Sequence, residues 1–107
     1  MILEIATIDI KDGLADEFEA AVSKAEPIFR RAKGCRSVAL ERSIESPQTY
    51  RLLVRWDTVE NHTVDFQQSS DFTEWRRLVG HCFAVLPKVE HTRCALTLDI
   101  DRSVGAP

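Results

Sequence analysis

Residues 50–91 of this 107-residue chain, YRLLVRWDTVENHTVDFQQSSDFTEWRRLVGHCFAVLPKVEH, decide the fold. The stretch opens with alternating residues, which predict a strand at 49–56 because successive side chains of a strand point to opposite faces. One face of this strand is apolar and ends in Trp56, whereas the other carries Arg51 and Arg55. We therefore expect a strand with one buried face that ends in an indole.

A helix is expected directly after this strand, over residues 57–66. Asp57 can accept from free backbone N–H groups at the helix start, and Glu60 can bond back to Asp57 as in a capping box. Helical spacing then places His62 and Phe66 on the same face. The histidine would lie near the tryptophan that ends the strand, which predicts a small pocket with aromatic and polar walls.

A second helix follows the first after a short interruption. It should begin at Ser70 and Asp71, and Pro87 should end it. Its inward face carries Phe72 and Trp75, followed by further apolar residues at helical spacing. This helix therefore adds two aromatic side chains to the predicted pocket.

Three further strands complete the expected sheet. They lie at 2–10, 35–43 and 89–100. The strand at 35–43 and the strand at 49–56 are separated by the turn at 45–48, which predicts a hairpin.

An earlier helix is expected over residues 14–33, where apolar residues recur with helical spacing. Pro27 removes one backbone hydrogen bond and should kink or split this helix near Ala25 and Glu26. Gly34 is well placed to cap its end.

The predicted order is β-α-β-β-α-β, the ferredoxin-like α+β arrangement with an antiparallel sheet. One domain spans residues 1–107, with a frayed tail at 102–107. The open face of the sheet is too apolar to leave in water. Its apolar residues are Leu3, Ile5, Ala39, Leu53 and Leu96. A second copy of the chain is the simplest cover, so we predict a homodimer whose two sheets face each other.

Composition argues against several classes of partner. Fourteen Lys+Arg against seventeen Asp+Glu give a net charge of −3, which argues against a nucleic acid. No apolar run approaches the roughly 20 residues that cross a bilayer, so we expect no membrane association and a cytoplasmic location. The widely spaced Cys35, Cys82 and Cys94 predict buried, reduced thiols. The three histidines lack metal-ligand spacing, so no metal site is expected.

The sequence also resembles a known family over roughly residues 1–100. The strand ending in -VRW-, the following -HTVDF-, the helix start -SSDFTEW- and the closing -P-x-VEH- are similar to the antibiotic biosynthesis monooxygenase (ABM) family. The resemblance implies a small dimeric α+β barrel. Members of the family include cofactor-free oxygenases of anthrones and quinols, haem-degrading enzymes and a signal-molecule isomerase. A shared fold does not fix the activity, so individual residues must separate these branches.

Haem degradation is the branch that the residues favour least. Haem-degrading members carry an Asn, a Trp and a haem-ligating His at three places. In this sequence those places hold Thr7 or its neighbour, Phe66 and Arg76. His81, one turn further on, is the only substitute for the haem ligand.

The resemblance to the anthrone-oxygenase branch is partial. The strand tryptophan of that branch matches Trp56, whereas Leu52 occupies the place of its Asn. His62 falls near the place of its Tyr and Arg76 near the place of its Arg. The resemblance therefore implies a similar pocket with different polar groups.

These residues define a candidate site. His62 is a candidate general base, because neutral imidazole titrates near physiological pH, and Arg76 is a candidate to hold a developing oxyanion. The expected substrate-binding residues are Trp56, Phe66, Phe72, Trp75 and His91. The alternatives are that His62 is a structural hydrogen-bonding group, that the two tryptophans belong only to the core, and that Arg76 is a surface cation.

The leading hypothesis is a cofactor-independent monooxygenase that oxidises a small aromatic quinol, phenol or anthrone-like substrate with O₂. Such a reaction requires a base, an oxyanion donor and a dry aromatic cavity, and no cofactor is expected. The alternative is a non-catalytic small-molecule-binding or stress-response barrel, and haem degradation is a third possibility.

Overall fold

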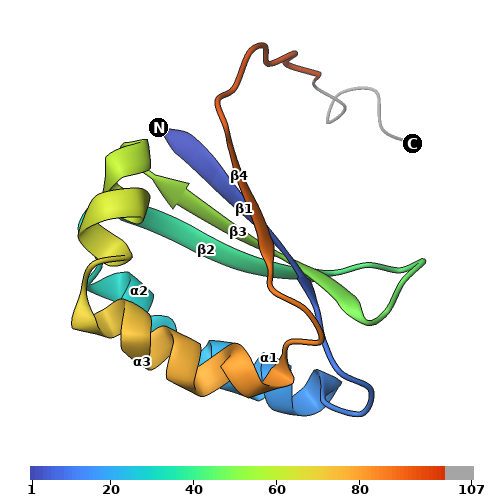
Figure 1. The fold of residues 1–107 in the computed structure, drawn as a ribbon. Coiled ribbons are helices and arrows are strands. Elements are labelled where there is room, and N and C mark those ends of the chain that lie inside the picture. The colour runs from blue at the N-terminus through green and yellow to red at the C-terminus, as the bar shows by residue number, and fades with distance from the viewer. Residues whose placement is uncertain (101–107) are drawn as a thin grey trace.

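The computed structural model describes residues 1–100, and Figure 1 shows the arrangement of their helices and strands. In chain order these elements are β1 (Ile2–Asp9), α1 (Ala15–Lys24), α2 (Glu26–Arg30), β2 (Cys35–Arg42), β3 (Thr49–Trp56), the π-helical η1 (Asn61–Phe66), α3 (Ser70–Val79), the 3₁₀ turn η2 (Gly80–Cys82) and β4 (Lys88–Thr92). The expected frayed tail at 102–107 lies outside the described residues.

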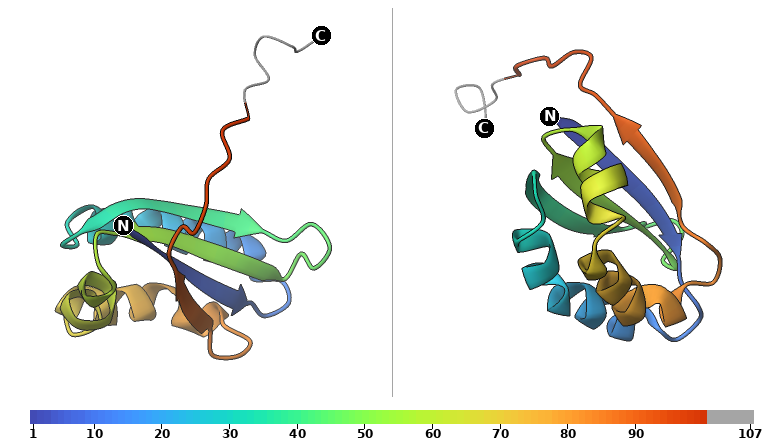
Figure 2. Two further views of the ribbon diagram at one scale, coloured as in Figure 1. Left: turned by 90° about the horizontal axis from the view of Figure 1, so that it is seen from above. Right: turned by 60° about the vertical axis from the view of Figure 1, so that its left-hand side comes forward.

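The four strands form one antiparallel sheet in the order β2-β3-β1-β4. This order confirms the predicted ferredoxin-like α+β fold, including the hairpin between β2 and β3. Figure 2 shows that the helices all lie on one face of the sheet, which leaves the other face without a covering layer.

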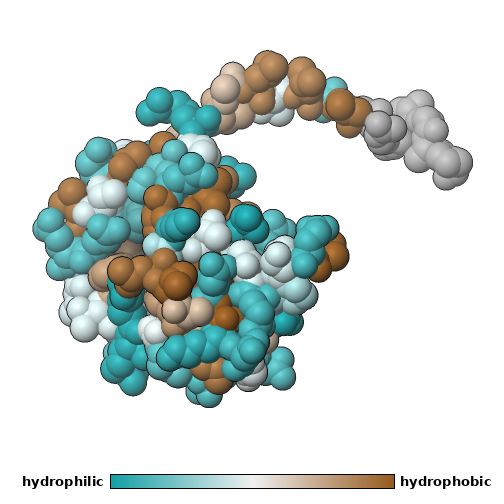
Figure 3. Space-filling model, turned by 45° about the vertical axis from the view of Figure 1, so that its right-hand side comes forward, coloured by the Kyte–Doolittle hydropathy of each residue, from teal (hydrophilic) through white to brown (hydrophobic). Residues whose placement is uncertain are grey.

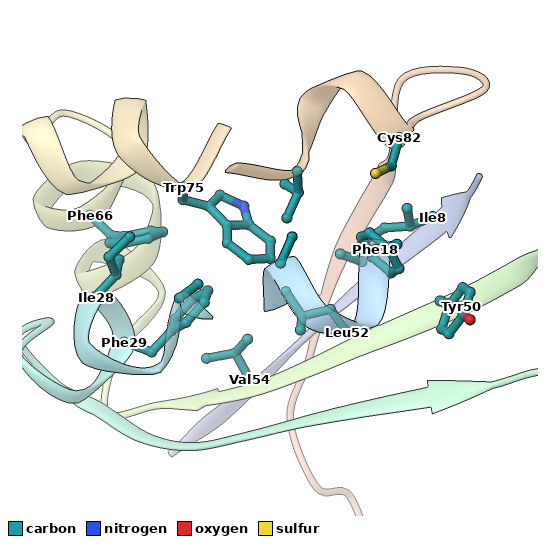
Figure 4. Close-up of a cluster of buried hydrophobic side chains, with 14 of the residues drawn as sticks. Ile8, Phe18, Ile28, Phe29, Tyr50, Leu52, Val54, Phe66, Trp75 and Cys82 are labelled. Carbon is teal, nitrogen blue, oxygen red and sulfur yellow. The ribbon is translucent and has the colours of Figure 1, made fainter. Parts of the chain in front are cut away.

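The core lies between the sheet and the helices because the strands alternate as predicted. Every even-numbered residue of β1 and β3 is buried, whereas the odd-numbered residues point to the open face. Figure 4 shows Leu52 and Val54 beneath aromatic side chains such as Phe29 and Trp75. Burying one such side chain contributes about 1.5–3 kcal/mol, so this layer makes a large favourable contribution to folding.

The proline splits the first helix where it was expected to do so. The helix α1 ends at Lys24 and α2 begins at Glu26, with Pro27 in its first turn, where a missing N–H costs nothing. Gly34 has a φ of +77°, but it lies four residues beyond the end of α2 and turns the chain into β2. It therefore serves the turn into the strand and not the helix cap that was predicted.

The predicted capping box at Asp57 is wrong by one residue. The Thr58 N–H donates to Asn61 Oδ1 at 3.1 Å, and the Asn61 N–H donates to Thr58 Oγ1 at 3.1 Å. Asp57 instead accepts two hydrogen bonds from Arg36, which lies in the irregular part of β2 opposite the end of β3. The Asp57 carboxylate is therefore bound to the Arg36 guanidinium and not to the backbone N–H groups of the helix start. The hydrogen bond from Arg36 lowers the pKa of Asp57.

The last strand is shorter than expected, since β4 ends at Thr92 and not at Ile100. Thr92, the last residue of β4, pairs with Leu3, the second residue of β1. Residues 93–100 leave the domain, as Figure 3 shows, with exposed apolar side chains at Leu96 and Leu98. Leu96 therefore does not lie on the open face of the sheet.

The cysteines differ in their burial, although none of the three forms a disulfide. Cys82 is buried as predicted, Cys35 is half-buried, and Cys94 is exposed because it lies beyond the end of β4. No helix within residues 1–100 is both long and apolar enough to cross a membrane.

Candidate functional site

A cavity of about 290 Å³ lies between the buried face of the sheet and the helices η1 and α3. Two polar side chains that are buried in the protein, Glu4 and His62, line this cavity. Its aromatic and apolar lining residues include Phe29, Phe66, Phe72, Trp75 and Phe83, and Arg76 and Gln67 add polar groups. The cavity therefore combines flat apolar walls with a few convergent polar groups, as small-molecule sites do.

Glu4 is the functional candidate that sequence reasoning missed. It lies on the buried face of β1 with 5% of its surface exposed, and its Oε1 accepts from Trp56 Nε1–H at 2.9 Å. The signal was present in the sequence, because Glu4 is the single charged residue in the alternating series Ile2, Glu4, Ala6, Ile8. A carboxyl group at a core position indicates a functional role more often than an apolar one does.

Burial raises the pKa of Glu4 to about 7, although the hydrogen bond from Trp56 opposes that shift. Desolvation disfavours the charged carboxylate, so the group exchanges its proton near neutral pH and not near its ordinary value of 4.5. A carboxyl group with this pKa is suited to proton transfer at physiological pH.

His62 lies 3% exposed in η1, and its Nε2 is 3.4 Å from Glu4 Oε1. Its Nδ1 lies 2.8 Å from Nε2 of His91, so one of these two facing nitrogens donates to the other. Burial, and then the charge of His91, lower the pKa of His62 to about 4. At neutral pH His62 is therefore uncharged, and the Glu4 carboxyl is the group that holds or releases a proton.

Of the predicted binding residues, three aromatic side chains line the cavity. The Phe66 and Phe72 rings meet edge to face at 5.6 Å, and the Trp75 ring meets Phe29 in the same way at 5.0 Å. Figure 4 shows Trp75 and Phe66 descending from the helices toward the sheet. Edge-to-face contacts hold the rings in fixed orientations, which favours a flat ligand over a flexible one.

Trp56 and His91 lie behind His62 and are not among the residues that line the cavity. Trp56 is fully buried and stacks on the His62 ring with centroids 5.4 Å apart and planes at 20°. His91 is half-buried on β4 and reaches the site only through its hydrogen bond to His62. Both residues therefore fix the position of the histidine ring.

Arg76 lines the cavity from the exposed side of α3. Its guanidinium lies 6.0 Å from the centre of the Phe72 ring and 5.8 Å from that of Phe83. These two contacts hold the cation beside aromatic walls of the cavity. The neighbouring Arg77 has a different role, since it forms an ion pair with Glu74 on the surface.

A larger cavity of about 460 Å³ lies elsewhere, between α1, α2 and the edge strand β2. Its charged groups include Glu26 and Arg30, which form an ion pair with each other on the surface. It is the more open of the two cavities and contains no buried titratable pair. We therefore place the candidate site in the smaller cavity.

The fold agrees with what comparison with known proteins shows. Residues 1–78 match the family model for antibiotic biosynthesis monooxygenases, so the chain belongs to the ABM family. The crystal structure of a Bordetella bronchiseptica protein classed with these monooxygenases is 57% identical, with a TM-score of 0.88 over 89% of this chain and 97% of that one. An uncharacterised Bacillus subtilis protein, YczJ, is 41% identical over 91 residues, which are 85% of this chain and 96% of that protein.

A more distant structure shows the fold alone. A Caulobacter crescentus protein, also classed with these monooxygenases, has a TM-score of 0.76 but only 20% identity. Family membership thus supports the architecture predicted from the sequence, whereas the activity must be argued from the site itself.

Proposed function

We propose that the protein is a cofactor-independent monooxygenase that oxidises a small quinol, phenol or anthrone-like substrate with O₂. The observation that carries this proposal is the buried Glu4–His62 pair at the wall of an aromatic cavity, with a carboxyl pKa of about 7. A flat aromatic substrate fits between the rings of the cavity, and an acidic proton on it would face a base of matched strength.

The reaction balances without a cofactor. The Glu4 carboxylate takes a proton from the substrate, and the resulting phenolate or enolate passes one electron to O₂. The substrate radical and superoxide then combine to form a C–O bond, and the peroxide regains the proton from the Glu4 carboxyl. Loss of water leaves a carbonyl group, so the substrate loses two hydrogens and gains one oxygen atom while the second oxygen atom leaves as water.

The other groups have supporting roles in this proposal. His62 is neutral, and its Nε2 lies 3.4 Å from Glu4 Oε1, so it borders and positions the carboxyl that acts as the base. The sequence indicated His62 as the general base, whereas this proposal assigns that role to the carboxyl of Glu4 beside it. Arg76 supplies positive charge to the oxyanion that proton loss creates.

The test is O₂ uptake by the purified protein with a panel of hydroquinones and anthrones, followed by identification of the quinone product. We expect uptake with at least one member of the panel and its loss in the His62→Ala variant. Uptake equal to that of the variant would contradict the proposal. Quenching of tryptophan fluorescence by a ligand that is recovered unchanged would instead favour a non-catalytic binding protein.

Arg76→Ala is expected to lower kcat/KM for the best substrate about tenfold or more, because a cation beside the developing oxyanion is lost. Arg77→Ala is the matched control, since Arg77 is the next residue on α3 and pairs with Glu74 outside the cavity. It should leave kcat/KM unchanged. If steady-state kinetics give the same kcat/KM for both variants, Arg76 does not stabilise the oxyanion.

We further propose that two copies of the chain associate through the open face of the sheet. Strand pairing places Ile5 beside Leu53 at the centre of this face, and both are only half-buried in the single chain. Glu41 pairs in register with Arg51 on the same face, so charges of both signs are available to the partner. A second copy would cover the apolar centre and present these charges to one another.

Leu53→Arg is expected to convert the dimer to a monomer, because it places a charge at the centre of the proposed interface without entering the core. Sedimentation velocity measures the change. Val64→Arg, on the exposed surface of η1, is the control and should remain dimeric. A wild-type protein that sediments as a monomer at all concentrations would overturn the proposal.

A further inference from the structure

Three potential metal ligands meet at one point outside the candidate site. They are Glu17 on α1 and the consecutive residues His81 and Cys82 at η2, and one ligand atom from each lies within 4.8 Å of the others. The Cys82 Sγ lies 3.5 Å from His81 Nε2 and 3.9 Å from Glu17 Oε2. The imidazole and the carboxylate are themselves in hydrogen-bond contact.

The position of the three groups is set by the fold. Cys82 is fully buried beside Phe18 and Ile8 at one end of the hydrophobic cluster, as Figure 4 shows, so its sulfur is held in place. Glu17 and His81 are exposed and lie next to the sulfur on the solvent side. A cation from solvent can thus reach the sulfur by entering between two exposed side chains.

The spacing suits a small tetrahedral cation. Zinc binds sulfur at about 2.3 Å and nitrogen or oxygen at about 2.0–2.2 Å, which in a tetrahedron places the ligand atoms about 3.4–3.6 Å apart. The sulfur–nitrogen distance already has this value, and the sulfur–oxygen distance exceeds it slightly. Only the imidazole and carboxylate must separate, which their exposed positions allow.

We propose that Glu17, His81 and Cys82 form a binding site for a zinc-class divalent cation, with water as the fourth ligand. The mixed nitrogen, sulfur and oxygen set favours Zn²⁺ over Mg²⁺ or Ca²⁺, which prefer oxygen ligands. The bound cation would join α1 to η2. Phe83, which follows Cys82 directly, lines the aromatic cavity, so the cation would also fix one wall of that cavity.

This inference is independent of the proposed oxygenase activity, and its test uses binding and stability alone. Tag-free protein is first treated with a chelator and is then titrated with ZnCl₂ in a calorimeter. We expect one Zn²⁺ per chain and a rise in Tm on addition, because a ligand that binds only the folded state stabilises it. Co²⁺ in place of Zn²⁺ should give a thiolate-to-metal charge-transfer band, which reports ligation by sulfur.

His81→Ala tests the site without disturbing the core, because the side chain is exposed. It should weaken Zn²⁺ binding about tenfold or more, since even groups that only support a ligand have effects of this size, and at equal Zn²⁺ concentration it should give a smaller rise in Tm than the wild type. Cys82→Ala should abolish the Co²⁺ charge-transfer band. Cys94→Ala and His91→Ala are the matched controls, and both should bind Zn²⁺ as the wild type does.

Three outcomes would overturn the proposal. They are the absence of binding heat from the folded wild-type protein, equal affinity of the wild type and His81→Ala, and a charge-transfer band that persists in Cys82→Ala. If Cys82→Ala does not fold, the comparison of His81→Ala with His91→Ala decides alone.

Discussion

Glu4→Gln is expected to lower kcat/KM for the aromatic substrate by about 10²- to 10⁴-fold while the protein remains folded. Glutamine has the same shape, and its amide oxygen can still accept from Trp56 Nε1–H. It cannot take a proton from the substrate, so only the chemical step is lost. Steady-state O₂ uptake measures the effect, and a variant that keeps wild-type kcat/KM would exclude Glu4 as the base.

The pH dependence adds a second readout for the same residue. For the wild type, kcat/KM should rise as the pH rises through about 7, where the buried carboxyl loses its proton, and should then reach a plateau. Glu4→Gln should lose this rise. Glu45→Gln is the control, because Glu45 is an exposed glutamate in the turn between β2 and β3, away from the cavity, and it should keep the wild-type profile.

Glu4 and His62 also make the free energy of unfolding depend on pH, and their two effects have opposite signs. Between pH 4.5 and about 7 the folded state binds more protons at Glu4 than the unfolded state does, so this group alone lowers the free energy of unfolding as the pH rises. Over this range Glu4 lowers the free energy of unfolding by about 3 kcal/mol in total, at 1.36 kcal/mol for each unit of pKa. His62 acts in the other direction between about pH 4 and 6.5, because there the unfolded state binds more protons.

These opposing trends predict a difference between variants. The wild type should show little change in unfolding free energy from this pair between pH 4.5 and 6.5. In Glu4→Gln only the histidine remains, so the free energy of unfolding should rise with pH over the same range. Urea unfolding at several pH values measures it, and a fall with rising pH in the variant would contradict the assignment.

Gly34→Ala is expected to destabilise the protein by about 3 kcal/mol or more, from two separate causes. Gly34 has a φ of +77°, which a Cβ disfavours by about 1–2 kcal/mol. A Cβ there would also lie 2.1 Å from Asn61 Oδ1, far inside van der Waals contact. Asn61 is buried and holds the start of η1 through Thr58, so it cannot move away freely.

Gly13→Ala is the matched control for this substitution. Gly13 has a φ of +79°, but nothing lies within 4 Å of its Cβ position. It should therefore show only the cost of the backbone conformation, about 1–2 kcal/mol. Urea unfolding compares the two variants, and equal losses of stability would show that the contact with Asn61 has no effect.

The double variant Gly34→Ala/Asn61→Ala isolates the contact itself. Its loss of stability should be smaller than the sum of the two single losses, because removal of the Asn61 side chain relieves the overlap. Asn61 precedes His62 directly, so Gly34→Ala should also displace the imidazole and lower activity. If the two losses of stability are additive, the contact with Asn61 has no part in the effect of Gly34→Ala, and the backbone conformation of Gly34 alone causes it.

Local periodicity was sufficient for most of the secondary structure. Alternation identified β1 and β3, and Pro27 located the break between α1 and α2, because both features depend on residues close together in the chain. The predictions failed where a distant partner mattered. Asp57 does not cap the helix, because it pairs with Arg36, which lies 21 residues away. The last strand ends at Thr92, where it pairs with Leu3 of β1, almost 90 positions away in the chain.

The sequence by itself determined the ferredoxin-like order and which faces of the strands are buried, since periodicity alone encodes them. It also placed His62 and the aromatic residues together, because neighbouring helices carry them. Only the tertiary structure decided that the carboxyl of Glu4 joins His62 and that Glu17 meets His81 and Cys82. Each of these contacts joins residues more than 50 positions apart, and the pKa shifts of Glu4 and His62 depend on burial, which exists only after the sheet and helices have packed.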